Sequence, residues 1–129
     1  SYSRASMPPR VQTVMIRFTA VRHTGRECSL QEVHLFSGAT DTPLQVISVS
    51  NPLGQWPGTQ TPANLVDGDL ETPRSKWVDL NMDSVGSSTL VLMLASPHQL
   101  EAYTFWTAND NPGRDPTSWQ VHWKVNGDW

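Results

Sequence analysis

Three oxygen-bearing side chains stand close together in one short segment of the chain. Asp67, Asp69 and Thr72 lie within six residues, and Gly68 between the two acids allows a sharp turn. A hard cation such as Ca²⁺ binds several oxygen atoms, including backbone carbonyls, at about 2.3–2.6 Å. This spacing is consistent with a cation site. The alternative is that both carboxylates accept hydrogen bonds from nearby backbone N–H groups and only stabilise turns.

The residues that could act as catalytic groups are scattered along the chain. No Gly-x-Ser-x-Gly, His-Glu-x-x-His or phosphate-binding motif occurs. His122 alternates with apolar residues, so we expect it to point to solvent. Cys28, the single cysteine, stands near Arg26, which would suit an activated thiol, but a buried and unreactive thiol is the simpler expectation. The sequence predicts that the protein is not an enzyme.

The elements that must position these residues are predicted to be β-strands. The clearest segment runs from Trp119 to Val125 and alternates apolar and polar residues, which indicates a strand with one buried face. No segment has helical periodicity, and Ser96–Gln99 is predicted to be a turn. The chain is therefore expected to be all-β. Its strands are predicted at Val11–Arg22, Leu30–Phe36, Leu44–Val49, Trp77–Leu80, Thr89–Leu94, Leu100–Thr107 and Trp119–Val125.

One hydrophobic core is predicted, because 129 residues are enough for a single domain. Residues 1–10 are expected to form an extended amino-terminal arm, since Pro8-Pro9 cannot join a strand ladder, and residues 11–129 the domain. The predicted core residues are Val14, Ile16, Phe18, Val33, Leu35, Leu92, Leu94, Phe105, Trp119, Val121 and Trp123.

The charge distribution limits the kinds of partner. The net charge of −3 is the sum of +5 in residues 1–26 and −8 in residues 27–129. No run of Lys and Arg interleaved with aromatic residues occurs, which argues against nucleic-acid binding. No apolar run reaches the length of a transmembrane segment.

Three segments together resemble one protein family. The polar loop "TANDNPGRDPTSW" at 107–119 is followed by a strand and by "NGDW". The segment "ANLVDGDLET" at 63–72 precedes Trp77, and "RF" at 17–18 precedes "LQEVHLF" at 30–36. These segments resemble the discoidin-like domains (coagulation factor 5/8 type C, galactose-binding-like). The resemblance covers nearly the whole chain and implies a jelly-roll β-sandwich that binds rather than catalyses.

The resemblance also implies a structural Ca²⁺. In the family the matching acid, the Thr and neighbouring carbonyls hold the ion, and a Glu from a nearby strand completes the site. By motif that Glu is Glu32, which would join Asp67, Asp69 and Thr72. One departure stands out, because residues 73–76 make the spacing from Thr72 to Trp77 longer than the family usually has. Arg74 or Lys76 could replace the cation.

Sugar-binding members of the family place an aromatic residue and a few polar side chains on loops at one end of the sandwich. By that resemblance Trp56 would stack on a sugar, while Asn109 and Arg114 would donate hydrogen bonds. The alternative is structural. Trp56 would then cover the core under a long loop, and Arg114 would pair with Asp110 or Asp115.

Two function classes follow. The first is a non-catalytic module that recognises a carbohydrate or another surface ligand, which the resemblance favours. The second is an accessory structural subunit that makes protein–protein contacts in a larger intracellular or organellar assembly. The resemblance implies an extracellular protein, whereas the single cysteine and the absence of an Asn-x-Ser/Thr sequon favour a reducing compartment. The Ser/Arg-rich start would suit the remnant of an organelle-import segment.

The last prediction concerns how the chain closes. Asn126-Gly127 is a two-residue hairpin signal, yet only Asp128 and Trp129 follow it. Segments that many discoidin relatives carry near their carboxyl end stand here at the start, an order that resembles a circular permutation. We therefore expect Trp129 to lie near the Val11 region. We also expect the strand at Trp119–Val125 to be partly unpaired on one side, or covered by another segment or chain.

Overall fold

The computed structural model describes residues 10–23, 27–38, 42–72, 75–108, 110–124 and 129. Within them the chain is all-β with antiparallel pairing, as predicted. The described helices are a single α-helical turn, α1 (Met82–Val85), and the 3-10 segments η2 (Pro62–Val66) and η3 (Pro112–Arg114). The strands are β1 (Arg10–Val21), β2 (Cys28–Leu30), β3 (Glu32–Phe36), β4 (Val46–Ser50), β5 (Trp77–Asp79), β6 (Ser88–Gln99), β7 (Ala102–Trp106) and β8 (Pro116–Trp123).

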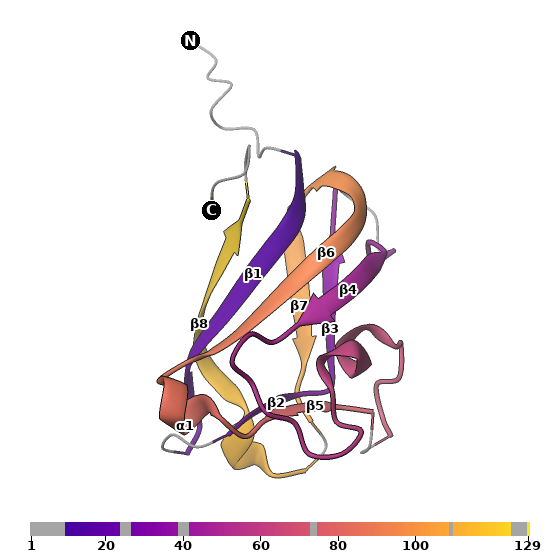
Figure 1. The fold of residues 1–129 in the computed structure, drawn as a ribbon. Coiled ribbons are helices and arrows are strands. Elements are labelled where there is room, and N and C mark those ends of the chain that lie inside the picture. Colours follow the sequence, from indigo (N-terminus) through magenta and orange to yellow (C-terminus); the bar gives the residue numbers. More distant parts are fainter. Residues whose placement is uncertain (1–9, 24–26, 39–41, 73–74, 109, 125–128) are drawn as a thin grey trace.

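The strands form two layers, as in a β-sandwich (Figure 1). One layer is a four-stranded sheet with the order β4-β6-β1-β8. The other layer contains β3 paired with β7, and the short pair of β2 and β5 crosses the lower end in Figure 1. The two layers meet at Phe18 of β1 and Phe105 of β7, whose ring centroids lie 5.7 Å apart.

The core lies between these layers. Alternation along β1 directs Val14, Ile16 and Phe18 inward, and all three are fully buried. The same face of β6 contributes Leu92 and Leu94. The buried apolar residues are Val11, Val14, Ile16, Phe18, Cys28, Leu30, Val33, Leu35, Leu65, Trp77, Val78, Met82, Leu90, Leu92 and Leu94. The core predicted for β1, β3 and β6 is therefore confirmed.

Two strand predictions need correction. The predicted strand at Leu30–Phe36 is divided at Gln31, because β2 ends at Leu30 and pairs with β5, whereas β3 begins at Glu32 and pairs with β7. The side chain of Gln31 points to the loop after η2. Ser96–Gln99 is not a turn, because β6 continues to Gln99 and pairs again with β1 at Arg10. The register of β1 against β6 shifts between the pairs Val11–His98 and Thr13–Met93. The extra residues of β6 therefore form a bulge, and the chain does not reverse there.

The carboxyl-terminal part of the predicted core is wrong. Trp119 and Trp123 are 37% and 39% exposed, and Phe105 and Val121 are only partly buried. The Trp side chains do share a face with the core, because Trp119 stands opposite Phe18 and Trp123 opposite Val14. β8 is the edge strand of its sheet, so the second layer covers its inner face incompletely.

Both expectations about chain closure hold within the described residues. Lys124 N donates to Thr13 O at 3.1 Å, and Lys124 Nζ lies 5.4 Å from the centroid of the Trp129 ring. Trp129 therefore lies near the start of β1. In the described part of the chain β8 pairs with β1 alone, so its other edge is open. The permuted order itself stays a prediction, and most of the expected arm, residues 1–9, lies outside the described residues.

The expectation of a buried thiol at Cys28 is confirmed. Cys28 is buried, and burial together with the charges of Asp79 and Asp115 raises the pKa of its thiol well above the usual range. The thiol is therefore protonated and inaccessible. No helix in the described part of the chain has the length and apolar character needed to cross a membrane.

Candidate functional site

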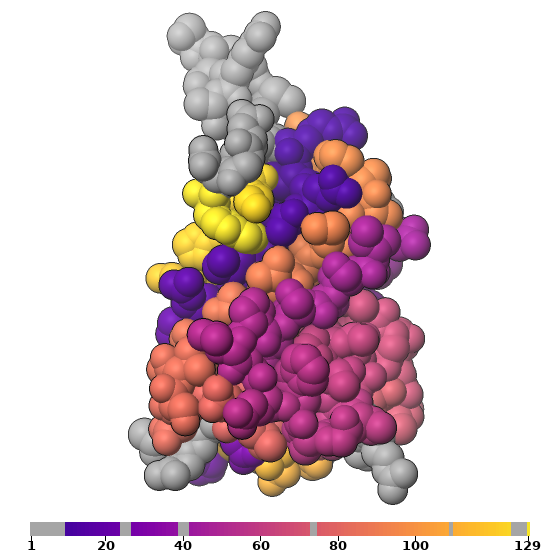
Figure 2. Space-filling view, viewed as in Figure 1, coloured from indigo at the N-terminus to yellow at the C-terminus, as the bar shows by residue number. Residues whose placement is uncertain are grey.

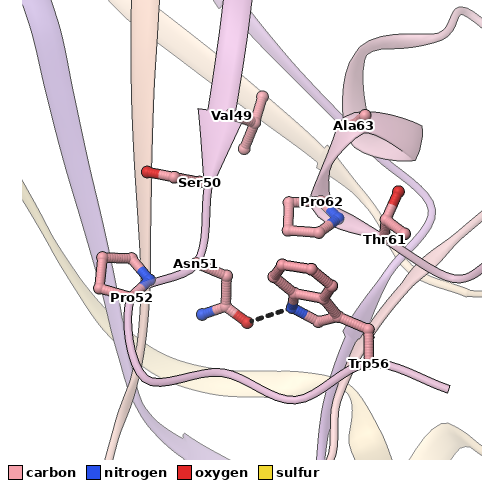
Figure 3. Close-up of a pocket in the computed structure, with 8 residues that line it drawn as sticks. All are labelled: Val49, Ser50, Asn51, Pro52, Trp56, Thr61, Pro62 and Ala63. Atoms are coloured by element: carbon pink, nitrogen blue, oxygen red, sulfur yellow. Dashed lines mark hydrogen bonds between the residues drawn. The ribbon is translucent and has the colours of Figure 1, made fainter.

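A cleft beside Trp56 is the clearest candidate for a binding site. The cleft has a volume of about 390 Å³ and lies between the end of β4 and the start of η2. The segment from β4 to η2 covers the lower part of the face in Figure 2. We call this cavity the Trp56 cleft. It is lined by Val49, Ser50, Asn51, Pro52, Trp56, Thr61, Pro62 and Ala63 (Figure 3).

The indole of Trp56 is held in place although it is 44% exposed. Its Nε1 donates a hydrogen bond to Asn51 Oδ1 at 3.0 Å (Figure 3). Asn51 is itself buried and also accepts from Trp77 Nε1 at 3.2 Å, while its Nδ2 donates to Thr89 O at 2.7 Å. An exposed aromatic ring is therefore fixed to the core through one amide. Such an ordered ring loses little conformational entropy when a ligand binds.

Glycine at position 54 makes this arrangement possible. A Cβ atom at Gly54 would lie 1.9 Å from Asn51 Oδ1 and 2.4 Å from Asn51 Cγ. The loop wraps this closely because Gly54 N donates to Asn51 O at 3.0 Å. A side chain at position 54 would therefore displace the amide that holds Trp56.

Of the other two residues expected at a sugar site, Arg114 is not brought to this cleft. Asn109 lies outside the described residues. Arg114 is in η3, does not line the Trp56 cleft, and donates to Glu27 Oε1 from Nε at 3.2 Å and from Nη2 at 3.1 Å. Of the two candidates that the structure describes, Trp56 lines the cleft and Arg114 does not.

The loop after β7 is tied to the body of the protein by charged groups. Lys76, a buried residue, donates from Nζ to Asp110 Oδ1 at 2.5 Å. Arg22 Nη2 lies 3.6 Å from Asp115 Oδ2, and Arg22 N donates to Asp115 O at 2.9 Å. Burial raises the pKa of Asp115, and the charge of Arg22 opposes that effect. The polar residues of this loop are thus used largely for internal contacts.

The segment Asp67–Thr72, called the Asp67 loop here, is closed by its own carboxylates. Asp67 Oδ1 accepts from Asp69 N at 2.9 Å, and Asp69 Oδ1 accepts from Glu71 N at 3.0 Å and from Thr72 N at 2.9 Å. The hydrogen bonds from Thr72 and Glu71 lower the pKa of Asp69. The turn-capping role considered for both acids is therefore present.

Glu32 reaches the same loop, as the motif suggested. Its Oε2 accepts from Gly68 N at 2.9 Å and lies 3.0 Å from His34 Nε2. Burial raises the pKa of Glu32 to about 7; the hydrogen bond from Gly68 opposes this rise and the nearby charge of Asp67 adds to it. Burial also lowers the pKa of His34. Glu32 Oε1 is buried and has no hydrogen-bond partner among the described residues.

Gln31 supplies a feature that the sequence did not indicate. Its Nε2 lies at the point where three backbone carbonyls converge, 3.1 Å from Asp69 O, 2.9 Å from Thr72 O and 3.3 Å from Ser75 O. The N–H groups of the Gln31 side-chain amide therefore occupy the position between these carbonyls that a cation could otherwise take. Gln31 Oε1 is buried and, within the described residues, has no hydrogen-bond partner.

The donor set around the Asp67 loop fits a hard cation with one condition. Carbonyl oxygens, the carboxylate of Asp67 and the unpartnered Oε1 of Glu32 are the oxygen ligands that Ca²⁺ prefers. The condition is that Gln31 turns its amide nitrogen away from the carbonyls. Among the described residues no group of three or more His, Cys, Asp or Glu side chains is placed to hold a metal, so carbonyls would have to supply part of the site. Lys76 pairs with Asp110, and Arg74 lies outside the described residues.

Comparisons with known proteins add no identification: no protein-family model, no curated protein and no solved structure matches the chain. The candidate sites therefore depend on the geometry of this chain alone. Asn51 and Gln31 are the two residues in them that sequence reasoning missed. Only Asn51 had a local signal, since Asn-Pro is a common way to end a strand.

Proposed function

We propose that the protein is a non-catalytic, discoidin-like binding module with a jelly-roll β-sandwich fold, and that it recognises a carbohydrate at the Trp56 cleft. The observation that carries the proposal is the half-exposed Trp56 ring, fixed by Asn51 at the wall of a cavity large enough for a sugar residue. Ser50 and Thr61 also line the cleft.

The chemistry of this cleft suits a sugar. One face of a pyranose ring carries C–H groups, which pack against an aromatic face, and its hydroxyl groups need hydrogen-bond partners. Apolar walls with a few polar groups are the usual composition of a small-molecule site. Because Trp56 already has its hydrogen bond to Asn51, the indole contributes its ring face and no unsatisfied N–H group.

A structural Ca²⁺ in the Asp67 loop is part of this proposal. The carboxylates of Asp67 and Glu32 and the backbone carbonyls of Asp69 and Thr72 would hold the ion, once Gln31 releases those carbonyls. When bound, the ion would neutralise the buried Glu32 carboxylate and stabilise the loop. The residues of this loop do not line the Trp56 cleft, so the ion has a structural role and no contact with the sugar.

The test is a glycan-array screen followed by calorimetric titration of the best ligand. Trp56→Ala should lower the affinity about tenfold or more, equal to at least about 1.4 kcal/mol, with an unchanged circular dichroism spectrum. Trp56→Phe should retain part of the affinity, because a ring face remains. Leu53→Ala is the matched control, since Leu53 is on the same loop, is 74% exposed and does not line the cleft.

Two results would argue against the sugar site. The first is an array without any ligand. The second is a ligand that Trp56→Ala binds as tightly as the wild-type protein does.

Arg114→Ala should leave the affinity unchanged, because Arg114 is engaged with Glu27.

A further inference from the structure

The open edge of β8 carries an exposed aromatic surface. Trp119 and Trp123 of β8 and Tyr103 of β7 are each 37–39% exposed. Trp119 Nε1 donates to Tyr103 Oη at 3.0 Å, so the two strands are linked across the open side of the sandwich. We call these three residues the aromatic edge. A groove of about 420 Å³ runs along it, lined in part by Val121 and Trp123.

The aromatic edge is an extension of the core. Phe18 contacts Trp77 and Phe105, with centroids 6.0 and 5.7 Å apart, and Phe105 contacts Trp119 at 5.1 Å. These rings pass from the fully buried Trp77 to the exposed Trp119. Apolar area of this kind, beside a strand edge that no described residue pairs with, is the surface that another strand would cover.

The two edges of the four-stranded sheet differ in protection. β4, at one edge, is short, has a register shift between Val46 and Ser48, and is followed by Asn51-Pro52. These features discourage pairing with another strand. β8, at the other edge, contains no Asp, Glu, Lys or Arg, and its pairing with β1 is regular from Trp119 to Trp123. β8 itself therefore carries no charge that would repel another strand, while Glu101 lines the adjoining groove.

The backbone groups at this edge can be assigned from the ladder with β1. Lys124 N donates to Thr13 O, and hydrogen-bonded positions alternate along an antiparallel strand. Gln120 and His122 therefore direct their backbone groups towards β1. Trp119, Val121 and Trp123 direct theirs to the open edge, while their side chains face inward.

From this arrangement we infer that the occupant of the open edge is a second copy of the chain, and that two β8 strands pair antiparallel about a two-fold axis at Val121. In that register Val121 pairs with itself, Trp119 pairs with Trp123 of the other copy, and each pair exchanges two backbone hydrogen bonds, about six in total. Inward aromatic residues pair with aromatic residues. On the outer face Gln120 stands opposite His122 of the other copy, so no like charges oppose each other.

With this two-fold axis the inferred assembly would end at two chains. An interface that pairs the same strand with itself is closed, and both copies of β8 are used in it. The other edge strand of the four-stranded sheet, β4, has the protective features described above. The pairing is also independent of the proposed sugar site, because no residue of β8 lines the Trp56 cleft.

Sedimentation velocity over a range of concentrations tests the inference with the 129-residue chain. The wild-type protein should reach twice the monomer mass of 14.4 kDa. Val121→Pro should remain monomeric, because it removes an edge N–H group without removing a hydrogen bond to β1. Val121→Ala is the matched control; it retains that N–H group and should still dimerise.

If Val121→Pro fails to fold, variants with introduced charges at positions 120 and 122 test the same inference. Both Gln120 and His122 are exposed. The double variants Gln120→Glu/His122→Glu and Gln120→Lys/His122→Lys should each be monomeric, because like charges would oppose each other twice. Their mixture should form a mixed dimer. A wild-type chain that is monomeric at every concentration would overturn the inference, as would a dimer that survives either double substitution.

Discussion

Trp56 Nε1 and Trp77 Nε1 both donate to Asn51 Oδ1, at 3.0 and 3.2 Å, so one buried amide joins an exposed tryptophan to a fully buried one. The site and the core are therefore coupled through a single side chain. Changes to Asn51 should affect both the affinity for a ligand and the stability of the fold.

Asn51→Ala is predicted to lower the free energy of unfolding by about 2–4 kcal/mol, because Trp77 Nε1 and Thr89 O would lose their partner in a buried place. Urea unfolding measures this change. Asn81→Ala is the control, since Asn81 Nδ2 donates to Leu53 O at an exposed position and its loss should cost less than about 1 kcal/mol. Equal losses in the two variants would contradict the role assigned to Asn51.

The pair of Lys76 and Asp110 should respond unequally to substitution. The side chain of Lys76 is 3% exposed and that of Asp110 is 46% exposed. Asp110→Ala would leave a buried ammonium group without its partner, and we expect a loss of about 3–5 kcal/mol. Lys76→Met would leave a carboxylate that water can solvate, so the loss should be smaller. Chemical denaturation of the two single variants and of the double variant measures these losses. A larger loss for Lys76→Met than for Asp110→Ala would contradict the prediction.

Removal of Ca²⁺ should lower the melting temperature of the wild-type protein, because an ion bound only by the folded state stabilises it. Glu32→Gln should abolish this dependence while retaining an oxygen that accepts from Gly68 N. Differential scanning calorimetry in Ca²⁺ and in chelator tests both statements. Identical melting of the wild-type protein in the two buffers would contradict the proposed ion and mean that the carboxylates of Asp67 and Asp69 and the Gln31 amide close the loop without it.

The thiol of Cys28 should be unreactive in the folded protein. Burial raises its pKa above the ordinary value of 9.0, so the unfolded chain releases the proton at a lower pH than the folded chain does. The free energy of unfolding should therefore fall as pH rises above about 9, and less so in Cys28→Ala. Labelling with a thiol reagent at pH 8 should be slow in buffer and fast in denaturant. Rapid labelling of the folded protein would contradict this account.

The sequence was most informative where period-two alternation was clear. β1 lies between β6 and β8 in the sheet, so its pattern predicted both the strand and the buried face. β8 shows the same alternation, yet Trp119 and Trp123 remain exposed. Alternation reports which side of a strand faces inward, and it carries no information on whether another layer covers that side.

The candidate sites were predictable only in part. Glu32 and the Asp67 loop meet as the motif suggested, through the bond from Gly68 N to Glu32 Oε2. The position of Gln31 among three carbonyls could not be predicted, because it depends on a break between β2 and β3. The pairing of Arg114 with Glu27 joins residues 87 positions apart, a contact that local sequence does not encode.

The central claim is that a sugar binds against the ring of Trp56, and the indole N–H resonances in a ¹H–¹⁵N spectrum test it most directly. The chain has six tryptophans, and substitution of each in turn assigns their resonances. On titration with the glycan selected by the array, the Trp56 signal should shift progressively and saturate, while those of Trp119 and Trp123 stay in place. A shift confined to Trp119 and Trp123, or no shift at saturating glycan, would contradict the account.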